Sequence, residues 1–136
     1  MPRLILILAL LLPASAYAEL EYSDAWIKNL PPPVPVRAGY MTIYNPQAEA
    51  VSIVEIHSES FASVEVHQTL MQDGMMRMEQ ISNLTIAAGE TVQLAPGGLH
   101  LMMMQPVQPT RPGETHRITI EYDDGSRQDL ELTVKK

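Results

Sequence analysis

The amino-acid sequence predicts a single all-β domain, a sandwich or barrel built from short strands. Apolar and β-branched runs recur at intervals of about eight to twelve residues, with turn-forming residues between them. No stretch of helical length shows a 3.6-residue hydrophobic period. A chain of 136 residues is long enough for one domain but not for two.

Each expected strand is a run of apolar and β-branched residues that ends at a turn signal such as Asn-Pro, Asp-Gly or Pro-Gly. In chain order the expected strands are Ala25–Asn29, Gly39–Tyr44, Val51–His57, Ser63–Leu70, Met75–Gln80, Thr91–Leu94, His100–Gln105, His116–Tyr122 and Gln128–Val134. The prolines at positions 31–33 and 35 predict an extended loop between the first two strands, because proline cannot donate to a sheet ladder.

The first 18 residues are expected to form a secretory signal peptide. Arg3 supplies the positive charge, and an apolar stretch over residues 4–12 is too short to span a bilayer. The triplet Ala16-Tyr17-Ala18 is typical of a cleavage site. We therefore expect an exported mature domain over residues 19–136, without a membrane anchor after cleavage.

The composition excludes some partners and some metal ligands. Without Arg3, eight lysines and arginines face 16 acidic residues, a net charge of −8, which argues against a nucleic-acid partner. The chain has no cysteine, so an exported domain must be held by its core alone, and thiolate ligation is impossible. Seven of the nine methionines lie between Met71 and Met104, although a core would scatter them.

An Asp-Gly pair at 73–74 predicts a β-hairpin that brings a histidine close to a methionine. If the pair forms a type I′ turn, His67 faces Gln80 and Thr69 faces Met78. Facing residues point to the same side of a sheet, and side chains alternate with a period of two, so these four residues share one face. A register slip of one residue would separate His67 from Met78.

The stretch "PGGLHLMMMQP" places a second histidine beside methionines. In a strand, His100 and Met102 lie on one face, whereas Leu101 and Met103 lie on the other, where we expect core. Met104 shares the face of His100, as Met76 shares that of Met78. These two methionines, together with Met71, could cover a bound metal or offer an adaptable surface to a partner.

Imidazole and thioether groups together suit Cu(I) better than other biological metals. The set His67, Met78, His100 and Met102 contains no carboxylate, which disfavours calcium, magnesium and manganese. Zinc prefers thiolate, imidazole or carboxylate to thioether, and a blue-copper centre needs a cysteine. Each pair alone would be weak support for a site, and the four together are stronger.

The spacing H-x10-M-x21-H-x-M resembles the signature of the periplasmic copper chaperones called PCu(A)C. The surrounding words "VEVHQTLMQDGMMRME" and "IAAGETVQLAPGGLHLMMM" resemble that family too, and the resemblance extends from about Asp24 to Val134. It implies a cupredoxin-like Greek-key β-sandwich or barrel. It also implies one Cu(I) ion, bound by His67, Met78, His100 and Met102.

The resemblance further implies a function and partners. Such proteins carry copper to acceptors, here expected to be cytochrome c oxidase subunit II, for its binuclear copper centre, or another copper assembly factor. The protein is expected to be a monomer and not an enzyme, since four protein ligands leave no open position on the metal for a substrate.

One alternative from a different functional class remains open. The chain could be a metal-free extracytoplasmic interaction module whose methionine-rich face binds a partner protein. The two other histidines, His57 and His116, are expected to be solvated surface residues, and Trp26 is expected to lie in the core or to form a packing lid.

Overall fold

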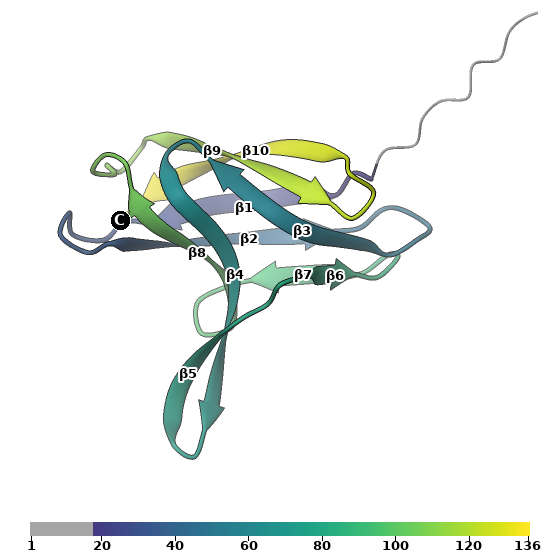
Figure 1. Ribbon diagram of the computed structural model, residues 1–136, viewed down its shortest axis with the longest axis horizontal. Coiled ribbons are helices and arrows are strands. Elements are labelled where there is room, and N and C mark those ends of the chain that lie inside the picture. The colour runs from purple at the N-terminus through teal and green to yellow at the C-terminus, as the bar shows by residue number, and fades with distance from the viewer. Residues whose placement is uncertain (1–17) are drawn as a thin grey trace, which may run out of the picture.

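The computed structural model describes residues 18–136, and within this range the chain forms strands and no helix (Figure 1). The strands are β1 Glu21–Lys28, β2 Val36–Tyr44, β3 Val51–Ser58, β4 Phe61–Gln72, β5 Met75–Gln80, β6 Leu84–Ile86, β7 Thr91–Leu94, β8 Leu99–Pro106, β9 Thr115–Tyr122 and β10 Arg127–Lys135. The all-β prediction is therefore confirmed. Every expected strand is present to within a few residues at its ends, and β6 is an additional short strand.

The predicted signal peptide, residues 1–18, lies outside the described residues except for Ala18. The division into a signal peptide and a domain from residue 19 stays a prediction. Among residues 18–136, no helix is long and apolar enough to cross a membrane.

The strands form one curled sheet in the order β5-β4-β8-β2-β1-β10-β9-β3-β6, and β7 pairs with β2 beyond the end of β8. Only the β1–β10 pair is parallel among these described strands. The sheet curls until β3 and β4 lie side by side without pairing, and a cleft of about 370 Å³ opens between them. The proline-rich segment forms the β1–β2 loop, as predicted.

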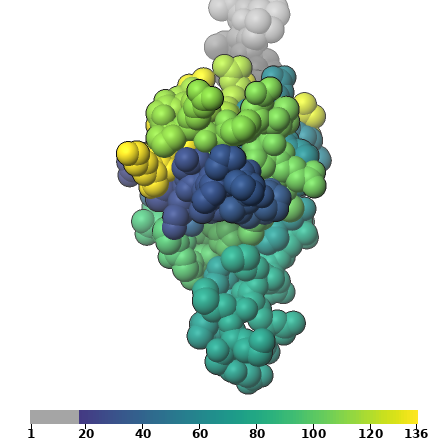
Figure 2. All heavy atoms as spheres, turned by 90° about the vertical axis from the view of Figure 1, so that its left-hand side faces the viewer, coloured from purple at the N-terminus to yellow at the C-terminus, as the bar shows by residue number. Residues whose placement is uncertain are grey.

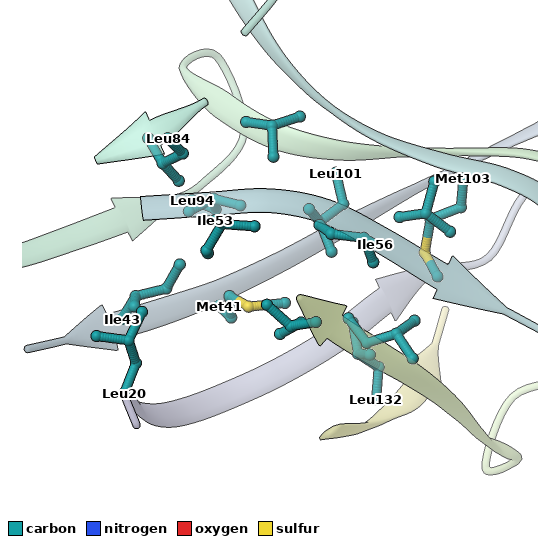
Figure 3. Packing of buried hydrophobic residues seen from close by; sticks show 14 of the residues in the cluster. Leu20, Met41, Ile43, Ile53, Ile56, Leu84, Leu94, Leu101, Met103 and Leu132 are labelled. Carbon is teal, nitrogen blue, oxygen red and sulfur yellow. The ribbon is translucent and has the colours of Figure 1, made fainter. Parts of the chain in front are cut away.

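The interior of the curled sheet is filled by one side-chain face of almost every strand (Figure 3). Leu101 and Met103 of β8 are 2% and 0% exposed, and Val64 and Val66 of β4 lie opposite them. Burying an aliphatic side chain of this size contributes about 1.5–3 kcal/mol. Because strand side chains alternate, burying this face of β4 and β8 fixes which residues the two strands present outward.

A partly buried tyrosine of β1 contacts a buried tyrosine of β9, the next strand but one in the sheet. The Tyr22 and Tyr122 hydroxyls are 2.7 Å apart, and Tyr122 donates to the Gln128 side-chain oxygen. Burial raises the pKa of Tyr22 far above its usual value, helped by the neighbouring Tyr122, and burial also raises the pKa of Tyr122. Both phenols are therefore harder to ionise in the folded protein than in the unfolded chain.

This pair predicts a loss of stability in alkaline solution. The raised pKa values mean that the tyrosines' contribution is complete below the unfolded value of about 10. It falls as pH rises from there through the folded-state values, because only the unfolded chain releases its phenolic protons readily. Urea unfolding between pH 8 and pH 11 should show this decline. Tyr22→Phe should make the decline shallower, and an equally steep decline in that variant would contradict the assignment.

Candidate metal site

The β4–β5 hairpin has the turn and the register that the sequence predicts. Asp73 and Gly74 both have positive φ, 53° and 74°, as a type I′ turn requires. His67 pairs with Gln80, and Thr69 pairs with Met78. The hairpin extends well beyond the barrel (Figures 1 and 2).

Strand β8 lies along the other side of β4 and brings the second histidine next to the first. His67 and His100 are direct cross-strand partners, with ring centroids 6.1 Å apart and ring planes inclined at 38°. Met102 pairs with Glu65, two residues along each strand. All of these side chains therefore share the face of β4 and β8 that points away from the core.

The hydrogen bonds of the two imidazoles leave one nitrogen of each ring unused. His100 Nδ1 lies 3.0 Å from the Gly98 carbonyl oxygen, and His67 Nε2 lies 2.8 Å from Glu65 Oε2. Both acceptors require a protonated nitrogen, so the lone pairs are on His100 Nε2 and His67 Nδ1. Those two atoms are buried and have no hydrogen-bond partner within the described part of the chain.

A buried polar atom without a partner costs about 1–3 kcal/mol, so two of them on facing residues are informative. In a neutral ring, each of these nitrogens carries the lone pair that can bind a metal. His100 is 4% exposed, and the His67 side chain is 17% exposed, so a metal held here would be partly shielded from water. The donor chemistry of the pair fits a soft or borderline metal ion.

The two predicted methionine ligands flank the histidine pair but differ in exposure. Met102 is half-buried on β8, two residues from His100. Met78 is on the edge strand β5, diagonal to His67 across the hairpin, and is 61% exposed. The structure thus brings all four predicted residues to one face. Their role as ligands stays a prediction.

Sequence reasoning missed the residues that orient the two histidines. The Glu65 carboxylate holds His67, and the Gly98 carbonyl holds His100. Such partners of metal-bound histidines fix the tautomer and raise ligand basicity. Glu65 could have been found, because it lies two residues before His67 and must therefore share its face.

The remaining methionines follow the predicted pattern. Met103 is fully buried, as expected. Met71 and Met76 face each other near the hairpin tip, on the ligand face, and are 70% and 68% exposed. Met104 is half-buried and pairs with Ser63.

Trp26 is half-buried and forms a lid rather than part of the core. Its ring lies 4.9 Å from that of Tyr40, and the Lys135 ammonium lies 5.7 Å from its centroid.

The prediction for His116 is wrong, because its side chain is only 16% exposed. Its ring contacts Phe61 edge-on, and its nitrogens lie 2.8 Å from Ser60 Oγ and 3.1 Å from Glu114 Oε2. Packing on Phe61 removes it from solvent. The side chain of His57 is 46% exposed, in agreement with a surface position.

Comparison with known families and proteins finds one matching family model and two relatives that cover most of the chain. The family model described as "Putative lipoprotein LpqE-like" matches residues 20–134. The "Putative lipoprotein Lxx21020" of Leifsonia xyli subsp. xyli is 30% identical over 131 residues, which cover 91% of this chain and 78% of the relative. The "Uncharacterized protein RP573" of Rickettsia prowazekii is 27% identical, with 91% and 70% covered.

Solved structures of PCuAC domains have the same fold. The copper-bound PCuAC domain of PmoF2 superposes with a TM-score of 0.73 at 16% identity, covering 88% of this chain and 95% of that domain. The Cu(I) form of DR1885 from Deinococcus radiodurans superposes with a TM-score of 0.68 at 32% identity, covering 82% and 75%. These matches confirm the predicted cupredoxin-like fold and support the predicted relation to the PCuAC family. The chain belongs to the LpqE-like family and has the fold of a PCuAC domain.

Proposed function

We propose that this protein binds one Cu(I) ion through His67, Met78, His100 and Met102 and carries it to acceptor proteins outside the cytoplasm. The observation that carries the proposal is the facing pair of imidazoles, each with a buried unpaired nitrogen, on the same face of the sheet as two thioethers. Further support comes from DR1885, which is 32% identical and was solved in a form named for Cu(I).

The donor set explains why a carrier would use these residues. Thioethers and imidazoles suit Cu(I), and neither forms a disulfide in an oxidising compartment. A site without thiolates should also hold copper less tightly, which favours release. Four protein donors leave no open position on the metal for a substrate, so we propose a carrier rather than an enzyme.

The location and the acceptor form the second part of the proposal. The signal-like N-terminus favours export to the periplasm, and the lipoprotein descriptions of the family and of a relative favour an extracytoplasmic protein. The acceptor would be cytochrome c oxidase subunit II or another copper assembly factor, with the chaperone acting as a monomer.

The projecting hairpin gives the acceptor a place to approach. Met78 is the exposed member of the ligand set, and Met71 and Met76 continue the same face to the hairpin tip. Exposed thioethers form an adaptable surface that can also contact copper during transfer. Copper would therefore leave past Met78, rather than past the buried His100.

Anaerobic titration with Cu(I) in the presence of a competing Cu(I) chelator tests this function. We expect one equivalent to bind, and X-ray absorption should show two sulfur and two nitrogen donors. A site of only nitrogen and oxygen donors would overturn the ligand assignment. Failure to bind Cu(I) would support the metal-free interaction module instead.

Removing the carboxylate that orients His67 should weaken copper binding without touching a ligand. Glu65→Ala is expected to lower Cu(I) affinity about 10- to 100-fold, the range observed for partners of metal-bound histidines. Glu65→Gln keeps an acceptor for the imidazole N–H and should lose less. The same chelator competition measures both, and an unchanged affinity in Glu65→Ala would show that Glu65 does not support the site.

A further inference from the structure

A second group of side chains of the kinds that bind metals lies on the outer face of β3 and β9, and it shares no residue with the histidine pair of β4 and β8. His57 Nε2 is 3.6 Å from Glu55 Oε2 and 3.8 Å from Glu121 Oε2. One ligand atom from each residue can be chosen so that all three lie within 4.8 Å of one another. Among residues 18–136, it is the one such grouping of three histidine or acidic side chains.

A β-bulge in β3 creates this grouping. Ile53 pairs with Tyr122 and Glu55 with Glu121, so Val54 is the extra residue on β3. Without the bulge, Val54 would face Glu121, and Glu55 would point toward the core. The bulge turns Glu55 outward onto the face of His57, and bulges that re-aim side chains in this way are common near functional sites.

The resulting arrangement brings two carboxylates together, and a cation between them would relieve their repulsion. Glu55 and Glu121 face each other directly across the strands, and like charges in such a pair destabilise a sheet. Arg127 Nη2 is 3.7 Å from Glu121 Oε1, the other oxygen of that carboxylate. The arginine thus holds Glu121 from one side, and Oε2 remains directed toward His57.

The grouping also lies where water and ions can reach it. Glu55 and His57 line the cleft between β3 and β4, and His57 also lines a hollow bounded by Arg117, Thr119 and Asp129. Side chains of Glu55 and His57 are 60% and 46% exposed, so they can adjust their rotamers. Waters could fill the remaining positions around an ion.

We propose that His57, Glu55 and Glu121 form a binding site for a borderline divalent metal ion, Cu²⁺ or Zn²⁺. One imidazole and two carboxylates suit these ions, whereas the absence of thioether makes the site unsuitable for Cu(I). Bonds of about 2.0–2.2 Å would place the ligand atoms about 3–3.5 Å apart. The two distances from His57 Nε2 to the carboxylate oxygens, 3.6 Å and 3.8 Å, are already close to that range. This site has no residue in common with the proposed Cu(I) site.

Titration with Cu²⁺, followed by electron paramagnetic resonance, tests the site directly. We expect one tightly bound Cu²⁺ with a single imidazole nitrogen, and Zn²⁺ should displace it. The titration is repeated with the double variant His67→Gln/His100→Gln, to exclude binding of Cu²⁺ at those two histidines. This variant should keep the Cu²⁺ signal. His57→Gln and Glu121→Gln should each weaken binding at least about tenfold, since loss of a ligand should cost no less than loss of a residue that orients one.

Glu131→Gln is the matched control, because Glu131 is an exposed carboxylate on the same outer face that pairs with Arg117 instead. It should leave Cu²⁺ affinity unchanged. Equal weakening in Glu131→Gln and Glu121→Gln would overturn the proposal and show only general attraction by an acidic surface. Unchanged binding in His57→Gln would overturn it as well. Neither result bears on Cu(I) binding, which has its own variants.

Discussion

Replacing Met103 by alanine is expected to destabilise the protein by about 2–5 kcal/mol, the usual cost of truncating a large buried side chain. Met103 is 0% exposed and pairs with Val64 on one side and Arg37 on the other. A Cβ added at Gly39 would lie only 3.2 Å from the Met103 sulfur, so the surrounding strands pack tightly on this side chain. Chemical denaturation, read as the free energy of unfolding, measures the loss.

Met103→Leu is the control for volume. Leucine nearly fills the same space, so this change should cost under about 1.5 kcal/mol and leave Cu(I) affinity unaltered. A loss of copper binding in Met103→Leu would mean that Met103, and not its neighbours, faces the metal. The assignment of β8 side chains to the core face and the outer face would then be wrong.

The hairpin could be predicted from sequence because its geometry depends on adjacent residues. Asp73 and Gly74 both tolerate positive φ, which the type I′ turn needs, and a two-residue turn fixes every facing pair of the hairpin. The alternation of side chains then assigned His67 and Met78 to one face. It also separated Met102 from Met103, which the structure places outside and inside.

The pairing of β4 with β8 could not be predicted in the same way. The two strands are separated in sequence by β5, β6 and β7, and no local turn links them. Periodicity shows that His67 and His100 each lie on an outer face, but it does not show that they are direct partners. That contact depends on how the whole sheet curls around its core.

The structure differs from the sequence predictions in two further places, and each difference has a physical cause. The environment of His116 depends on Phe61 and Ser60, which come from the distant start of β4 and the turn before it. The bulge at Val54 interrupts the alternation of β3, so that two consecutive residues are exposed where a regular strand would show one. The surroundings of His116 leave no signal in the hydrophobic pattern. The bulge does leave one, because the apolar alternation of Val51 and Ile53 resumes at Ile56 instead of at Glu55.

Met102→Leu and Met78→Leu should each weaken Cu(I) binding at least about 100-fold, beyond the loss expected for a residue that only orients a ligand. Leucine keeps most of the side-chain volume and removes the sulfur. Replacing the half-buried Met102 by leucine should therefore lower the free energy of unfolding by less than about 1.5 kcal/mol. Replacing the exposed Met78 by leucine should change the free energy of unfolding by no more than about 0.5 kcal/mol. Chelator competition gives the affinities, and thermal unfolding gives the stabilities.

Met104→Leu separates ligation from a general requirement for methionine on this face. Met104 shares the face of Met102 but pairs with Ser63, one step further from the histidines. Its replacement should leave Cu(I) affinity unchanged, and it should slow transfer to an acceptor if this methionine contacts the partner. A variant set in which Met104→Leu weakens binding as much as Met102→Leu would contradict a discrete four-ligand site. Copper would then be held by the methionine face as a whole, with His67 and His100 as its only fixed donors.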